Sequence, residues 1–93
     1  MRSLTDKRVL ITGGASGIGF AIAQHAAAAG ARIVLTDVNE PLLAQATTSL
    51  RESGCDVAEY RLDVTDPDDV AATRDRINAD GGPIDLAALE TEV

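Results

Sequence analysis

Short strand-forming segments alternate with helix-forming segments along this chain, and this alternation limits the fold more than any other feature. Arg8–Thr12 and Ala31–Asp37 are largely apolar and rich in β-branched residues, as is typical of parallel strands buried on both faces. Apolar and polar residues alternate more in Val57–Val64, which favours a strand nearer a sheet edge. Pro83–Ala87 is the candidate for a short fourth strand. Strands separated by helices predict right-handed crossovers and one parallel sheet.

The intervals between these segments carry signals for the start and the end of a helix. The first helix is predicted from about Ser16 to Ala29, because the glycine at position 30 can adopt the left-handed conformation that ends a helix. Asn39 and Asp66 are the predicted N-caps of the second and third helices, and a proline follows each within the first turn. The helical residues expected to face the core are Leu42, Leu43, Ala46 and Leu50, followed by Val70 and Ile77.

Charge and composition exclude several classes of function. The 93 residues carry a formal net charge of −7, so neither nucleic acid nor an anionic membrane surface is expected as a partner. Hydrophobic residues make up 45%, which fits one globular domain over residues 1–93. Cys55 is the single cysteine, which fits a reducing, cytoplasmic setting, and no metal site is predicted. We see neither a signal peptide nor a stretch apolar enough to span a membrane.

The glycine-rich stretch TGGASGIG, residues 12–19, directly follows the first predicted strand. A strand that turns at once into a helix presents the free N–H groups of that helix to an anion. Gly13 permits the tight turn, Gly17 leaves room for a pyrophosphate, and Gly19 lets the helix pack closely on the strand. The stretch therefore predicts a phosphate-binding turn.

The spacing T-G-x-x-x-G-x-G resembles that of the non-extended branch of the short-chain dehydrogenase/reductase family. Three further stretches resemble the same family: GIGFAIAQHAAAAGARIVLTD (17–37), LDVTDPDDV (62–70) and GGPID (81–85). The resemblance extends over nearly the whole chain, from about Lys7 to Leu86. The resemblance implies an α/β fold, a Rossmann-type doubly wound parallel sheet, here truncated to three or four strands and three helices. We expect the strand order 3-2-1 with strand four beside strand one, the first two helices on one face and the third on the other.

Two acidic residues indicate which cofactor the resemblance implies. Asp37 ends the second strand, 18 residues after Gly19, where a carboxylate accepts hydrogen bonds from the adenosine ribose and would repel the 2′-phosphate of NADP. Ser16 stands where NADP-using relatives tend to carry Arg or Lys, so both positions point to NAD. Asp63 and Val64 match the pair that contacts adenine in the family. The alternative is that Asp37 and Asp63 only stabilise turns.

The cofactor-binding residues that the resemblance implies are Gly13, Ser16, Gly17, Ile18, Gly19, Asp37, Val38, Asp63 and Val64. His25 is expected on the surface, Cys55 partly buried, and Tyr60 in the packing of a strand. Asp66, Asp68 and Asp69 are expected to serve the start of a helix rather than a metal.

Catalytic residues of the family have no match in this chain. The family uses a serine and a Tyr-x-x-x-Lys pair, whereas the only lysine, Lys7, precedes the only tyrosine. The chain is therefore predicted to be the NAD-binding half of an oxidoreductase that acts on an alcohol or ketone, catalytically incomplete alone. The expected partners are NAD and either a second copy or the missing half; the substrate is not indicated. The alternative is a standalone nucleotide-binding or interaction module.

Overall fold

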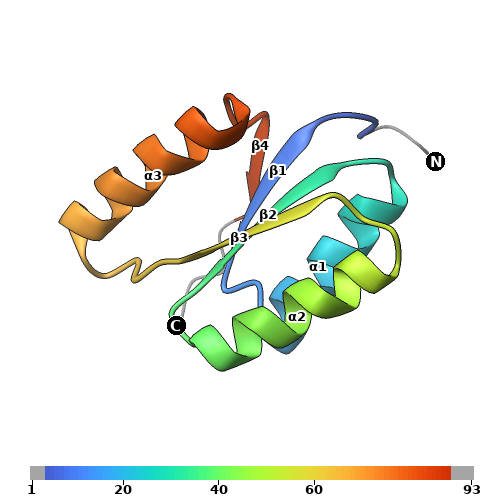
Figure 1. Cartoon of the computed structure of the whole chain (residues 1–93), viewed down its shortest axis with the longest axis horizontal. Helices are drawn as coiled ribbons and strands as arrows, with labels where there is room; N and C mark the ends of the chain where they lie inside the picture. Colours follow the sequence, from blue (N-terminus) through green and yellow to red (C-terminus); the bar gives the residue numbers. More distant parts are fainter. Residues whose placement is uncertain (1–3, 89–93) are drawn as a thin grey trace.

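The computed structural model describes residues 4–88 as a parallel sheet with helices on both faces (Figure 1). The elements in chain order are β1 (Arg8–Thr12), α1 (Gly17–Ala28), β2 (Arg32–Asp37), α2 (Glu40–Glu52), β3 (Val57–Arg61), α3 (Pro67–Gly81) and β4 (Leu86–Ala88). The strand order is β3-β2-β1-β4, and all three neighbouring pairs are parallel. The predicted fold and strand order are confirmed. Within residues 4–88, no helix has the length and apolar character needed to cross a lipid bilayer.

Three strands begin or end differently from the prediction, β2 by a single residue at its start. β3 stops at Arg61, three residues before the predicted end, because β2 offers no pairing partner beyond Asp37. The N–H of Leu62 still donates to the Asp37 carbonyl oxygen at 3.1 Å, and the chain then turns away. β4 begins at Leu86 rather than at position 83, where a proline has no N–H to donate. The N–H of Asp85 donates to the Arg8 carbonyl oxygen at 2.8 Å, which starts the pairing with β1.

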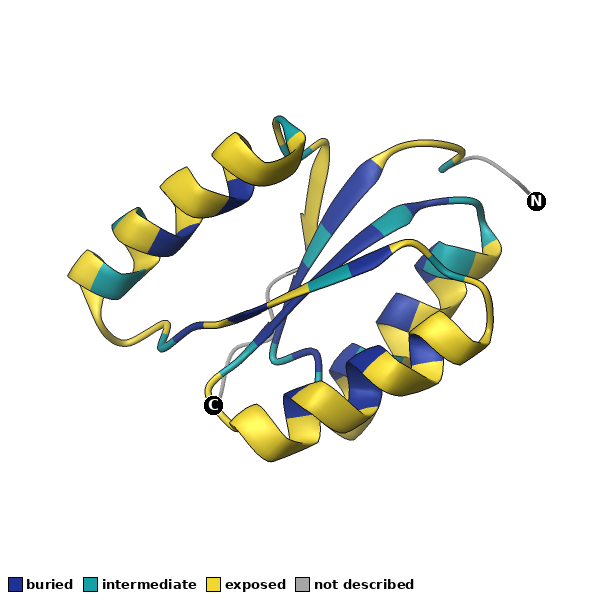
Figure 2. Cartoon of the chain, viewed as in Figure 1, coloured by how far each residue is buried: buried dark blue, intermediate teal, exposed yellow. Residues whose placement is uncertain are grey.

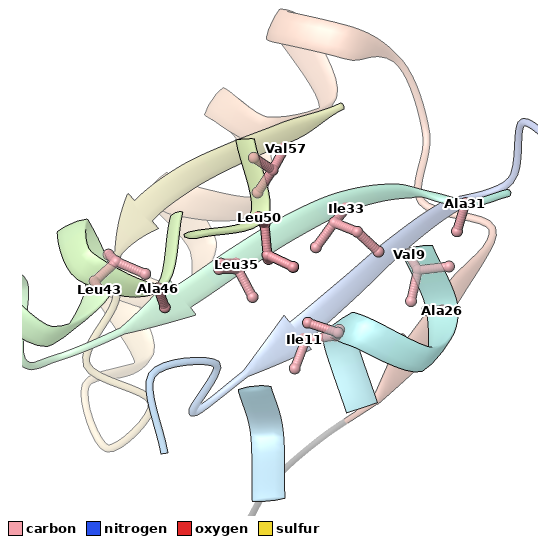
Figure 3. Close-up of a cluster of buried hydrophobic side chains, with 11 residues drawn as sticks. Val9, Ile11, Ala26, Ala31, Ile33, Leu35, Leu43, Ala46, Leu50 and Val57 are labelled. Carbon is pink, nitrogen blue, oxygen red and sulfur yellow. The ribbon is translucent and has the colours of Figure 1, made fainter. Parts of the chain in front are cut away.

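The main hydrophobic core lies between the sheet and the two helices α1 and α2, which share one face (Figures 1 and 3). Side chains from β1 and β2 interdigitate there with small and branched residues of both helices. The cluster consists of Val9, Ile11, Ala23, Ala26, Ala31, Ile33, Leu35, Leu43, Ala46, Leu50 and Val57. A smaller cluster, built on Val34, Tyr60 and Ile77, lies beneath α3 on the opposite face. Figure 2 shows that most of α3 is exposed.

The predicted helix starts are confirmed by hydrogen bonds at the N-caps. Ser16 Oγ accepts from the Gly19 N–H at 3.0 Å, Asn39 Oδ1 from the Leu42 N–H at 3.1 Å, and Asp66 Oδ1 from the Asp68 N–H at 3.0 Å. Each cap satisfies one of the backbone donors that a helix start leaves unpaired. The acidic run before α3 therefore acts as a helix start, as predicted.

Two residues predicted to face the core are exposed instead. Leu42 is 45% exposed because the buried stripe of α2 runs through Leu43 and every third or fourth residue after it, about 100° away around the helix. Val70 is 37% exposed, and α3 buries only Thr73 and Ile77. The apolar contact of α3 with the sheet is thus narrow.

A buried cation, not predicted from the sequence, compensates for this narrow contact. Arg8 is only 5% exposed, and its Nη1 donates to the carbonyl oxygens of Ile77 at 2.8 Å and Gly82 at 2.6 Å. These carbonyls belong to the C-terminal end of α3, where the helix dipole favours positive charge. Arg8 therefore fastens the end of α3 to the first strand.

Candidate nucleotide-binding site

A cleft of about 320 Å³ lies where the carboxyl ends of β1, β2 and β3 meet the segments that follow them. This end of an open parallel sheet is the usual place for a ligand. The cleft is lined by Gly13, Ser16, Asp37, Val38, Leu62, Asp63, Val64 and Thr65. Six of these eight were predicted as cofactor-binding residues. Leu62 and Thr65 were not, although both flank the predicted Asp63–Val64 pair.

The glycine-rich turn between β1 and α1 forms one wall of the cleft. Gly13 has a φ of 67°, a backbone conformation that residues other than glycine rarely adopt. Its carbonyl oxygen accepts from the Ser16 N–H at 3.0 Å and from Ser16 Oγ at 2.7 Å. The N–H of Gly14 donates to the Thr36 carbonyl oxygen at 2.9 Å, which ties the turn to the end of β2. The turn is therefore fixed by its own backbone and by the neighbouring strand.

Gly17 and Gly19 are glycines for different reasons. A Cβ at Gly19 would lie 2.2 Å from the carbonyl oxygen of Gly13, so no side chain fits there. The close approach is between α1 and the turn itself, whereas it was predicted between the helix and the strand. A Cβ at Gly17 would have no described atom within 4 Å apart from its chain neighbours and the backbone of its own helix. The packing of the described residues therefore does not require a glycine at position 17, and the space beside it is open.

Backbone donors remain available at the start of α1. Between residues 14 and 20, five N–H groups donate within the turn, to β2, or within the first turn of the helix. Those of Gly17 and Ile18 have no acceptor in the described part of the chain, and both residues are exposed. Unpaired N–H groups at a helix N-terminus, where the dipole is positive, bind anions.

Asp37 faces this turn from the end of β2. Its Oδ2 accepts from the Ala15 N–H at 3.0 Å, and its Oδ1 accepts from the Asn39 N–H at 2.9 Å. The carboxylate is partly exposed and lines the cleft, so it can still accept hydrogen bonds from a ligand. Asp37 thus has the turn role that was the alternative, and it also lines the cleft. Val38, next in the chain, is 54% exposed at the cleft.

The segment after β3 forms the opposite wall. Asp63 Oδ1 accepts from Thr65 Oγ1 at 2.6 Å and from the Thr65 N–H at 3.0 Å, and these bonds hold the pKa of the Asp63 carboxyl below its usual value. Asp69, in the first turn of α3, accepts from the Asp63 N–H at 2.8 Å. Val64 is 56% exposed and lines the cleft. This wall offers one ionised acceptor and one apolar surface.

The remaining singled-out side chains lie away from the cleft. His25 is exposed on α1, and Cys55 packs partly buried against the main core, both as expected. Tyr60 is buried, and its hydroxyl donates to Asp80 Oδ2 at 2.5 Å. Burial and this hydrogen bond raise the pKa of Tyr60, so its phenol stays protonated over the neutral range.

Residues 7–88 match the family model described as short chain dehydrogenase. The chain belongs to this family. It is 36% identical over 86 residues to the uncharacterized oxidoreductase YxbG of Bacillus subtilis, a match that covers 92% of this chain and 32% of that protein. The chain thus spans about a third of the length of the curated relatives that it matches.

Solved structures of short-chain dehydrogenases have the same fold over this region. A short chain dehydrogenase/reductase from Burkholderia phymatum in complex with NAD has a TM-score of 0.86 and 36% identity, covering 94% of this chain and 31% of its own. L-sorbose reductase from Gluconobacter frateurii, complexed with NADPH and L-sorbose, has a TM-score of 0.92 and 34% identity, and the match covers 99% of this chain and 35% of the reductase chain. Similar chains therefore bind either nicotinamide cofactor.

Proposed function

We propose that this chain binds NAD in the cleft, as the cofactor-binding part of an oxidoreductase that transfers hydride between NAD and an alcohol or ketone. The observation that carries the proposal is the pair of unpaired N–H groups of Gly17 and Ile18 at the start of α1. An anion-binding helix start next to a cleft at the carboxyl ends of parallel strands suits a dinucleotide. When bound, NAD supplies the hydride acceptor.

The residues present fit the parts of the dinucleotide in order across the cleft. The turn residues Gly13, Ser16, Gly17, Ile18 and Gly19 would surround the pyrophosphate, and the unpaired N–H groups of Gly17 and Ile18 would bind it. Asp37 would accept from the adenosine ribose hydroxyls. Val38, Asp63 and Val64 would take the adenine, the valines against the ring and the carboxylate toward its amino group. Six of these residues line the cleft, and Gly17 and Ile18 are exposed at the start of α1, whereas Gly19 is buried and serves the shape of the turn.

The preference for NAD over NADP rests on charge. The cleft is lined by two carboxylates and by no lysine or arginine among the described residues. A 2′-phosphate beside Asp37 would add a repulsion of a few kcal/mol per unit charge at partial exposure, roughly the value for two charges near a protein surface. Because similar chains bind either cofactor, this preference depends on Asp37 rather than on family membership.

Titration calorimetry with NAD, NADP and ADP-ribose tests the proposal. NAD and ADP-ribose should bind, NADP more weakly. Gly17→Val should abolish binding, because its side chain would occupy the open space beside the helix start. Equal or tighter binding of NADP would remove Asp37 from the ribose site, and unchanged binding by Gly17→Val would remove the pyrophosphate from the turn.

Hydride transfer by the 93-residue chain alone is not expected. Tyr60 is buried against Asp80 on the α3 face, and the sequence has no lysine four residues after it. A proton donor would need a pKa near the working pH and access to the substrate, and Tyr60 has neither. NADH formation should stay at background over a panel of alcohols. Turnover by the pure chain would contradict this.

We also propose that the chain associates with a second copy or with the remaining part of a full-length family member. β4 pairs with β1 on one side only among the described strands, and Leu86 on it is 48% exposed. Leu10 and Ala58 beneath α3 are only partly buried. Open edges and half-covered parallel sheets recruit further chain. Sedimentation should show dimers or larger species; a compact monomer that unfolds cooperatively well above room temperature would refute this.

A further inference from the structure

The Asp37 carboxylate is already engaged at both oxygens by the protein itself. Oδ2 accepts from the Ala15 N–H at 3.0 Å, from a residue 22 positions earlier in the chain, and Oδ1 accepts from the Asn39 N–H at 2.9 Å. A ribose contact alone would require neither bond. The geometry thus gives Asp37 contacts that shape the site as well as contacts for a ligand.

The bond to Ala15 matters because it falls in the middle of the glycine-rich turn. The preceding residue, Gly14, donates its N–H to the backbone carbonyl oxygen of Thr36. Two consecutive N–H groups therefore fasten the turn to the end of β2. The bond of Gly14 survives any substitution at position 37, whereas the bond of Ala15 depends on the Asp37 side chain.

We propose that Asp37 is a positioning residue for the phosphate-binding turn, in addition to its role toward ribose; this inference rests on the proposed function of the cleft. Through Ala15, the carboxylate holds the turn in the shape that leaves the Gly17 and Ile18 N–H groups exposed. Asparagine cannot replace it, because its single oxygen can serve one of the two N–H donors while its NH₂ group opposes the other.

The two roles predict opposite results for a ligand that has no ribose. If Asp37 served only the ribose, removing its negative charge would leave binding of inorganic pyrophosphate unchanged or make it tighter. If Asp37 positions the turn, the same substitution weakens pyrophosphate binding despite the lost repulsion. The positioning role also means that Asp37→Ala narrows the preference for NAD mainly by weakening the binding of NAD. The affinity for NADP should not increase.

The test compares Asp37→Asn and Asp37→Ala with the charge-matched control Glu40→Gln. Glu40 is exposed at the start of α2, outside the cleft lining, and its carboxylate lies 3.8 Å from Arg61 Nε. Amide hydrogen exchange and pyrophosphate titration are followed by NMR on the whole 93-residue chain. The buried amides of Ile33 and Val34 report whether each variant stays folded.

Both Asp37 variants should accelerate hydrogen exchange at the Ala15 amide by about tenfold. This is the loss of protection expected when one charge-assisted hydrogen bond at a partly exposed site is removed. Pyrophosphate binding should weaken about three- to tenfold by the same reasoning. Glu40→Gln should leave Ala15 exchange unchanged and pyrophosphate binding unchanged or tighter.

Unchanged Ala15 exchange in both Asp37 variants overturns the proposal, as does pyrophosphate binding as tight as in Glu40→Gln. If the unmodified chain does not bind pyrophosphate, the proposed nucleotide site fails, and Ala15 exchange alone decides the positioning role. If one Asp37 variant loses protection of the Ile33 and Val34 amides, it has unfolded, and the other variant is used to judge Ala15 exchange and pyrophosphate binding. Loss of this protection in both overturns the proposal, because Asp37 then supports the whole sheet rather than the turn.

Discussion

Gly19→Ala is the substitution for which the structure gives the sharpest expectation. The added methyl group would lie 2.2 Å from the Gly13 carbonyl oxygen, 2.9 Å from the Gly13 carbonyl carbon and 3.1 Å from Gly14 Cα. All three are backbone atoms of the tight turn, so no change of side-chain rotamer relieves the clash. Gly13 is itself held at a φ of 67° by the fold of the turn. Either α1 or the turn must therefore move.

The magnitude follows from two opposing effects. Overpacking a tight site costs about 1–3 kcal/mol of unfolding free energy, and a contact about 1 Å too short belongs at the upper end. Alanine regains at most about 1 kcal/mol of helix propensity relative to glycine. The net loss is about 1–2 kcal/mol, which lowers the melting temperature of a domain of this size by roughly 5–15 °C.

Gly17→Ala is the matched control, since it adds the same methyl group two residues earlier in the same helix. Apart from its chain neighbours and the backbone of its own helix, no described atom lies within 4 Å of the added methyl group, so the stability of Gly17→Ala should stay within about 0.5 kcal/mol of that of the unmodified chain. Binding should show the reverse pattern, because the methyl group of Gly17→Ala enters the proposed pyrophosphate position. Urea and thermal unfolding by circular dichroism measure the first effect, and calorimetric titration with ADP-ribose measures the second.

Gly19→Ala as stable as the unmodified chain would refute the close approach of α1 to the turn. An equal loss of stability in Gly17→Ala would show that any Cβ in this segment is harmful, whatever its surroundings. Unchanged ADP-ribose binding by Gly17→Ala would place the phosphate elsewhere while leaving the stability argument intact.

Three further outcomes follow from hydrogen bonds in the structure. The pKa of Tyr60 is raised by burial and by Asp80, so the protonated phenol stabilises the fold below about pH 10, and this stabilisation should be lost as the pH rises through the folded-state pKa. Spectrophotometric titration and alkaline unfolding measure the effect, and Tyr60→Phe should abolish it. The pKa of Asp63 is lowered chiefly by the hydrogen bond from the Thr65 hydroxyl, so Thr65→Val should raise this pKa toward the ordinary aspartate value. Carboxyl NMR titration would show the change, and an unchanged pKa would discount that bond. Arg8→Met should cost about 2–3 kcal/mol of unfolding free energy in urea, and α3 amides should exchange faster than those of α2; uniform acceleration would contradict a local role for Arg8.

Much of the fold follows from local signals in the sequence. The capping residues, the prolines after them and the glycine-rich turn each act within a few residues, so they fix where helices begin. The rotation of each helix about its axis is less determined, since α2 and α3 offer more apolar residues than the sheet covers. Leu42 and Val70 were assigned inward for that reason, and tertiary packing left them exposed.

The unpredicted features depend on contacts between distant parts of the chain. The burial of Arg8 depends on the Ile77 and Gly82 carbonyls, which lie 69 and 74 residues away, and nothing near Arg8 indicates it. The hydrogen bond from the Ala15 N–H to Asp37 likewise joins two segments that lie 22 residues apart in the sequence. The cleft itself was predictable, because the carboxyl ends of parallel strands meet at one edge of the sheet. Its internal hydrogen bonds were not.

The exposed apolar residues divide into two groups with different physical meanings. Val38 and Val64 line the cleft, so a bound adenine would remove them from water. Ile22 and Leu86 lie on α1 and β4, outside the residues that line the cleft, and no nucleotide bound there would cover them. Burial of apolar surface contributes about 25 cal/mol per Å² only when something covers it. The proposed cofactor binding and the proposed association with further chain would therefore stabilise different parts of this molecule, and neither would substitute for the other.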